Sequence, residues 1–127
     1  MNDVTRFLQG MGLQPVDQGF LDSEFIMGQC VRTSQFTLVY RQEKERLLLC
    51  DFSSSGADGQ AVAALLALLR RVARGVPALR HIDAMILAAP NDPELDRARR
   101  RLADLMLAEG ARPIRLDDEV WLRYRCA

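Results

Sequence analysis

The apolar residues of this chain repeat with two different periods, and the change between these periods restricts the fold more than any other feature. From residue 35 to residue 52 the period is two, with Phe36, Leu38 and Tyr40 alternating with Thr37, Val39 and Arg41. A polar turn, Gln42 to Glu45, separates this run from a second apolar run, Arg46 to Phe52. A period of two is typical of strands, so this segment is predicted to be a β-hairpin. Phe25 to Thr33 is predicted to form an earlier strand.

Three other segments show the helical period. The first places its apolar residues at Val4, Phe7, Leu8 and Met11, after a cap at Asn2 or Asp3. The second is predicted from about Gly59 to Arg74, with Asp58 as its N-cap and Gly75 at its end. The third begins at Asp92-Pro93, where proline suits the first helical position, and reaches about Ala108 before Gly110.

The order of these elements defines the fold class. Three more strands are predicted over Ile82–Ala88, Arg112–Leu116 and Glu119–Arg125, while Gly12–Ser23 is predicted to be a loop. The length of 127 residues corresponds to a single domain, residues 1–127. We therefore expect an α/β (α+β) sandwich with the order α-β-β-β-α-β-α-β-β, in which helices pack on the faces of a mostly antiparallel sheet. The run Leu47 to Cys50 is apolar on both sides, so its strand should lie inside the sheet with helices covering it.

Charge and cysteine content restrict the partners and the compartment. Seventeen basic residues balance seventeen acidic ones, so neither nucleic acid nor a membrane is expected as a partner. The N-terminal residues lack the pattern of a secretory signal, and the longest apolar run, residues 61–69, is too short to span a bilayer. Cys30, Cys50 and Cys126 form no close pair, which favours a reducing cytoplasm. Zinc held by these cysteines and His81 is the alternative, but no two of these ligands are near in sequence, and no metal is expected.

The sequence shows no arrangement typical of nucleophilic catalysis. Ser53 to Ser55 could form a triad with His81 and Asp83, but a GxSxG turn is missing. The acidic run Asp117 to Glu119 is predicted to be a hairpin turn rather than a metal site. A basic stripe on the third predicted helix has acidic neighbours, which favours a solvated face over a nucleic-acid site. This stripe consists of Arg97, Arg99, Arg100 and Arg101.

From the hairpin onward, the element order resembles the catalytic part of GNAT-type acetyltransferases. In that family acetyl-CoA lies against a central strand, with its pyrophosphate at the N-terminus of the next helix. The corresponding segment runs from Ser53 to Gln60, so the resemblance implies Gly56, Gly59 and Gln60 as cofactor-binding residues. Gly56 fits the family pattern, whereas Ser53 and Asp58 depart from it. Met106 stands where the family has a tyrosine acid, and Ala111 stands where it has phenylalanine after Gly110. Divergent acetyl-CoA binding or acetyltransferase activity is therefore the alternative function.

A second resemblance is to LcrR-type regulators of bacterial type III secretion. It rests on the strand Phe36 to Arg41 with its charged turn and apolar return strand, and on the strand Ile82 to Ala88. It also rests on the arginine-rich helix that ends in Gly110-Ala111-Arg112, and on a closing strand that contains Trp121. The resemblance implies a small cytoplasmic virulence protein without enzymatic activity or cofactor, which acts as a regulator or in a chaperone-like way. Its implied partners are proteins of the secretion apparatus, the needle tip or the translocator.

Trp121 is the candidate residue for protein contact. It is opposite in phase to Val120, Leu122 and Tyr124, so it points away from the core if those three residues face it. Tryptophan is enriched at the energetic centres of protein interfaces. The alternative is that a helix covers this side of the sheet. The contact could join the chain to a different protein or to a second copy in a homodimer.

Overall fold

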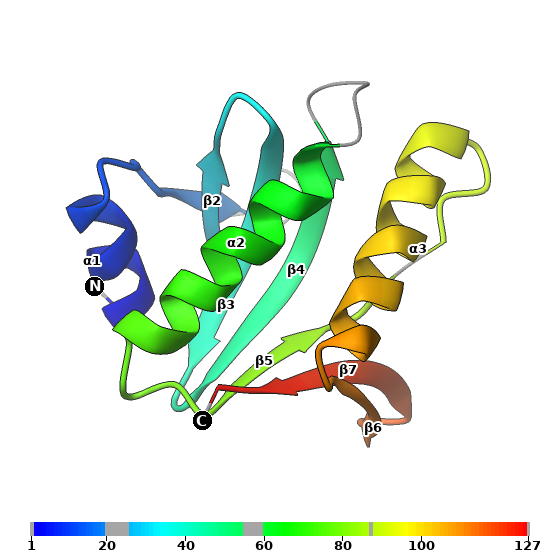
Figure 1. Cartoon of the computed structure of the whole chain (residues 1–127). Coiled ribbons are helices and arrows are strands. Elements are labelled where there is room, and N and C mark those ends of the chain that lie inside the picture. The colour runs from blue at the N-terminus through cyan, green and yellow to red at the C-terminus, as the bar shows by residue number, and fades with distance from the viewer. Residues whose placement is uncertain (1, 20–25, 55–59, 87, 127) are drawn as a thin grey trace.

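The computed structural model describes residues 2–19, 26–54, 60–86 and 88–126. These residues form three helices and a seven-stranded sheet with the strand order β1-β2-β3-β4-β5-β7-β6 (Figure 1). Among the described strands β4 and β5 are the one parallel pair, and every other neighbouring pair is antiparallel. The elements are α1 (Asp3–Gly10), β1 (Val16–Gly19), β2 (Ile26–Arg32), β3 (Phe36–Glu43), β4 (Arg46–Ser54), α2 (Gln60–Gly75), β5 (His81–Ala84), α3 (Pro93–Ala108), β6 (Arg112–Leu116) and β7 (Glu119–Arg125).

All three helices pack on one face of the sheet (Figure 1). In α1, the Val4 backbone N–H donates to the side-chain oxygen of Gln42 at 3.0 Å, and the Thr5 hydroxyl bonds to the Tyr40 hydroxyl at 2.7 Å. The buried apolar residues of α2 and α3 share one core with residues of β3, β4 and β5 that point to the same face. We call this side of the sheet the helix face and the opposite side the helix-free face.

The expected fold class is confirmed. The predicted helices and strands occur in the predicted order, and the sheet is mostly antiparallel with helices packed against it. The loop prediction for Gly12–Ser23 is wrong at Val16–Gly19, which forms β1 and pairs with β2. This strand is four residues long and Val16 is 51% exposed, so its backbone pairing leaves little hydrophobic pattern in the sequence.

The helix ends follow the local signals in the sequence. The side chain of Asn2 accepts a hydrogen bond from the Thr5 N–H at 2.7 Å, and Asp92 accepts one from the Leu95 N–H at 3.2 Å. Pro93 starts α3, and Gly110 follows it with a φ of 102°, the left-handed conformation that glycine adopts without strain. The predicted N-cap Asp58 lies outside the described residues. Within the part of the chain that is described, no helix is long and apolar enough to cross a membrane.

Two glycines permit close packing. A Cβ on Gly28 would lie 2.2 Å from the backbone oxygen of Tyr40, so the approach of β2 to β3 requires glycine there. A Cβ on Gly75 would lie 2.1 Å from the ring of Phe7, which joins α1 to the end of α2. Gly75 was expected to follow the helix, but it is the last residue of α2 and its small size makes room for that ring.

Candidate functional site

Three rows of side chains that cross the strands lie within the helix-free face. Register places Arg112, Arg123, Asp83, Leu48 and Arg41 side by side on β6, β7, β5, β4 and β3, and we call this set the arginine row. A second row, which we call the end row, lies two residues from the arginine row on one side. It consists of Arg125, His81, Arg46 and Glu43. The apolar row lies two residues from the arginine row on the other side and has two parts. Val16, Cys30 and Val39 align on β1 to β3, and Trp121 aligns with Ile114 on β7 and β6. Between the two parts, Val39 pairs with Asp51 on β4.

A buried carboxylate lies at the centre of the arginine row. Asp83 is fully buried, although it is on the face without helices. Its two oxygens accept hydrogen bonds from Nε and Nη2 of Arg123 at 2.9 and 3.0 Å, and Nη1 of Arg46 lies 3.8 Å away. The hydrogen bond to Asp83 raises the pKa of Arg123. One carboxylate is thus shared by two guanidinium groups, which leaves the cluster positively charged.

Leu48 shows how this face is covered. It is buried at 7% exposure even though the described helices lie on the other side of the sheet. Its neighbours across the sheet are Arg41 and Asp83, and long arginine side chains can shield an apolar neighbour with their methylene groups. The expected position of β4 inside the sheet is confirmed. Helices cover only the side of β4 to which Leu47 and Leu49 point.

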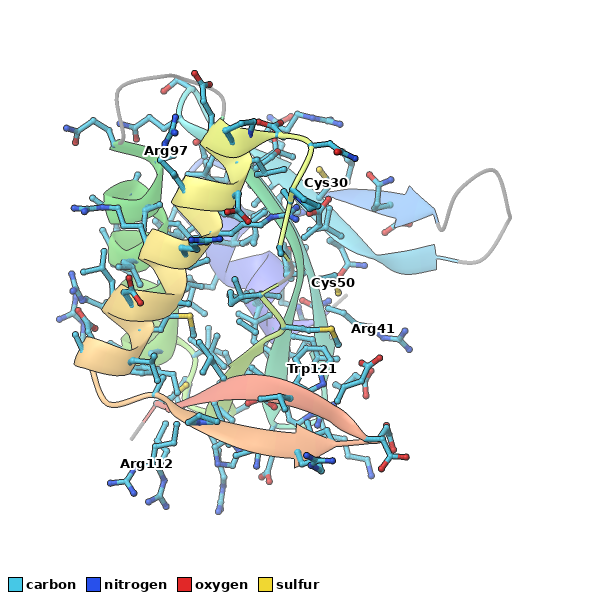
Figure 2. All side chains as sticks on the ribbon, turned by 90° about the vertical axis from the view of Figure 1, so that its right-hand side faces the viewer. Cys30, Arg41, Cys50, Arg97, Arg112 and Trp121 are labelled. Atoms are coloured by element: carbon cyan, nitrogen blue, oxygen red, sulfur yellow. The ribbon has the colours of Figure 1, made fainter. Side chains whose placement is uncertain are left out.

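Trp121 lies on the helix-free face, as its phase predicted. It is half-buried and lies opposite Ile114 on β6. Leu122 and Tyr124, which point the other way, pack against the core, whereas Val120 is 57% exposed at the start of β7. Figure 2 shows Arg41 and Cys50 on the side of the sheet turned away from α3, and Arg97 on α3 itself. The alternative of a helix over Trp121 is not seen among the described elements.

A gap opens where the two parallel strands separate. The last paired residues are Leu49 on β4 and Ala84 on β5, and β4 continues alone to Ser54. For this reason β5 ends at Ala84, short of the predicted Ala88. The cavity between the two strands has a volume of about 30 Å³, which accommodates roughly two water molecules.

Arg99 spans this gap from α3. Its Nε donates to the Phe52 backbone oxygen at 3.3 Å and its Nη2 donates to the Asp51 carboxylate at 2.9 Å. Its side chain is 17% exposed. The prediction that Arg99 belongs to a solvated stripe is therefore wrong, because it turns inward to the carbonyl group that β5 leaves unpaired. Arg97, Arg100 and Arg101 are exposed.

Of the residues implied by the acetyltransferase resemblance, Gln60 alone is among those that the structure describes. Gly56 and Gly59 lie outside the described residues, and Gln60 is the exposed first residue of α2. Met106, at the position of the family's acid, is buried in the core and has no proton to donate. The geometry places a parallel strand pair before a helix N-terminus, but no described acid stands at that position.

The other chemical candidates are not brought together. Both oxygens of Asp83 bind Arg123 rather than His81, and Ser53 is opposite Thr37, about 15 Å along β4 from Leu48. Asp117 and Asp118 form the predicted turn, with φ values of 50° and 64°. All three cysteines are free. Among the described residues no group of three His, Cys, Asp or Glu side chains could hold a metal.

Sequence reasoning missed the partners that join Asp83 to Arg123 and Arg46. These residues are far apart in sequence, and register alone places them on adjacent strands. One signal was present, since Arg123 and Arg125 share the phase of Trp121 along β7. No protein-family model matches this chain, and no curated protein shows significant similarity to it.

Proposed function

We propose that this chain is a non-catalytic, cytoplasmic accessory or regulatory protein of a type III secretion system, which acts through protein contact. The resemblance of the hairpin and of the region around β5, α3 and β7 to LcrR-type regulators supports the choice of system. Its partner is a protein of the secretion apparatus, the needle tip or the translocator. The observation that carries the mode of action is the helix-free face, on which Trp121 adjoins the arginine row.

The composition of this face suits a protein partner. Tryptophan and arginine are the residue types most enriched at the energetic centres of interfaces. Trp121 and Arg123 lie two residues apart on one side of β7, and β7 pairs on both sides, with β5 and with β6. A side chain on such a strand is held in place before binding, which reduces the entropy lost on association.

Binding to purified partners tests this proposal. The wild-type chain is titrated by calorimetry with the purified needle-tip, translocator and secretion-apparatus proteins of the same bacterium. We expect one of them to bind, and Trp121→Ala to weaken that binding at least tenfold. Val120→Ala is the matched control, because Val120 is the adjacent residue and points to the other side of β7. The proposal fails if none of these proteins binds, or if both variants bind as the wild type does.

A second candidate function is acetyl-CoA binding at the gap between β4 and β5. The observation that favours it is the parallel pair followed by the N-terminus of α2, since ligands of α/β sheets bind beyond the carboxyl ends of such strands. Against it stand the cavity of about 30 Å³ and the guanidinium of Arg99 across the gap. Addition of millimolar acetyl-CoA should leave the melting temperature unchanged, whereas a clear rise would favour this second function.

A further inference from the structure

We propose that the helix-free face recognises an extended acidic segment of the partner protein, one face of which presents carboxylate and apolar side chains in turn. This inference rests on the proposed function and specifies the chemistry of the partner. The whole chain has a formal net charge of zero, yet the arginine row and the end row together hold five arginines and two acidic residues.

The two acidic residues are already engaged by arginines of the same rows. Asp83 binds Arg123 and Arg46, and Glu43 lies 3.3 Å from Arg41 and 3.7 Å from Arg46. Each carboxylate therefore serves two guanidinium groups. The ion pairs within these two rows therefore leave an excess of positive charge. Additional carboxylates on a partner would neutralise this excess.

Arg112 and Arg125 carry the remaining charge. Both are exposed, and neither forms an ion pair within the described ranges 2–19, 26–54, 60–86 and 88–126. Arg112 lies beside Arg123 on the edge strand β6, and Arg125 lies two residues beyond Arg123 on β7. A planar guanidinium binds a carboxylate through two parallel hydrogen bonds, so each is suited to one acidic side chain.

The apolar residues beside these arginines favour a protein segment over a nucleic acid. Ile114 and Trp121 lie two residues from Arg112 and Arg123 along β6 and β7, about 7 Å away. An extended peptide repeats its side chains on one face at the same distance, so carboxylates over the arginine row place apolar residues over the apolar row.

Charge reversal tests the inference with a matched control. The double variant Arg112→Glu/Arg125→Glu is compared with Arg97→Glu/Arg101→Glu, which makes the same charge change at exposed positions of α3. The probe is a fluorescent synthetic peptide with the repeat Glu-Ser-Leu-Ser, which in an extended conformation presents glutamate and leucine in turn on one face. Comparison probes replace glutamate by lysine, replace leucine by serine, or are a single-stranded DNA oligonucleotide. Circular dichroism establishes that each variant is folded.

We expect the wild type to bind the Glu-Leu peptide. The affinity should be at least tenfold lower in Arg112→Glu/Arg125→Glu, the β6/β7 variant, and within twofold of wild type in Arg97→Glu/Arg101→Glu, the α3 variant. Binding should weaken as salt rises, and the lysine and serine peptides should bind more weakly. Equal losses in both variants, or equal binding of the lysine peptide, would overturn the inference. Preference for the oligonucleotide, lost in the β6/β7 variant, would assign the face to a nucleic acid instead.

The same variants separate this inference from the proposed function. Suppose that a needle-tip or translocator protein binds, and that Trp121→Ala weakens this binding while Arg112→Glu/Arg125→Glu does not. The proposal of an acidic segment is then wrong, and the proposed function stands. If the Glu-Leu peptide binds through these arginines but no secretion protein does, the recognition chemistry stands and the proposed function is wrong.

Discussion

Asp83 is the buried charge that orders the helix-free face, and Asp83→Asn is the perturbation that tests its role. Arg123 donates to both of its oxygens at 2.9 and 3.0 Å, and Arg46 lies 3.8 Å away. Asparagine keeps the shape of the side chain but removes the negative charge and one of the two acceptor oxygens. The two guanidinium groups then lie close together without a carboxylate between them.

The expected loss of stability follows from these contacts. A hydrogen bond to a charged group contributes about 1.5–3 kcal/mol, and removal of one partner of a fully buried ion pair costs about 3–5 kcal/mol. The side chains of Arg123 and Arg46 remain 25% and 27% exposed. Water can therefore replace part of the interaction with the carboxylate that the two guanidinium groups lose. We therefore expect Asp83→Asn to lower the free energy of unfolding by about 2–3 kcal/mol.

Urea unfolding followed by circular dichroism measures this change. Asp51→Asn is the control, because Asp51 also binds an arginine, Arg99, but its side chain is 57% exposed. Its loss should be below about 1 kcal/mol. A loss for Asp83→Asn within about 0.5 kcal/mol of zero, the range of ordinary surface substitutions, would refute the structural role of this ion cluster. Equal losses for the two variants would refute the argument from burial.

Three further outcomes are expected. Gly28→Ala should cost at least about 2 kcal/mol in urea unfolding, because its Cβ would lie 2.2 Å from the Tyr40 backbone oxygen; unchanged stability would show that β2 can move away. Burial raises the pKa of Cys126 from 9.0 to about 11, so the stability gained from the neutral thiol is complete below pH 9 and is lost as the pH rises towards 11. At pH 9, iodoacetamide should therefore alkylate Cys126 several-fold faster in the urea-unfolded chain, as measured by mass spectrometry, and equal rates would contradict this. Arg99→Met should lower stability by about 1 kcal/mol, because the Phe52 carbonyl loses a donor, and an unchanged urea midpoint would count against that contact.

Local signals account for the parts of the fold that the sequence predicted correctly. Capping by Asp92 and the left-handed conformation of Gly110 depend on residues next to each other in the chain, so both ends of α3 could be located. The alternation from Phe36 to Phe52 gave the hairpin for the same reason. The phase of Trp121 could also be predicted, because it follows from its neighbours on β7.

The parts that could not be predicted depend on contacts between distant residues. Val16–Gly19 becomes a strand through its pairing with β2, and β5 ends at Ala84 because β4 separates from it. The apolar pattern of Leu47 to Cys50 predicted cover on both faces, but arginines rather than a helix flank Leu48. Likewise, Arg99 fell in a stripe of charged residues, and its turn inward depends on a carbonyl group 47 residues away in sequence.

The central claim is that the helix-free face is the surface that binds the partner. Backbone amide NMR of the labelled chain, titrated with the needle-tip or translocator protein that binds it, tests this claim most directly. We expect the resonances of the Trp121 indole N–H and of the Arg112, Arg123 and Arg125 amides to shift or broaden, while those of the α3 amides stay unchanged. Changes confined to α3 residues 97–101, with β6 and β7 unaffected, would contradict it.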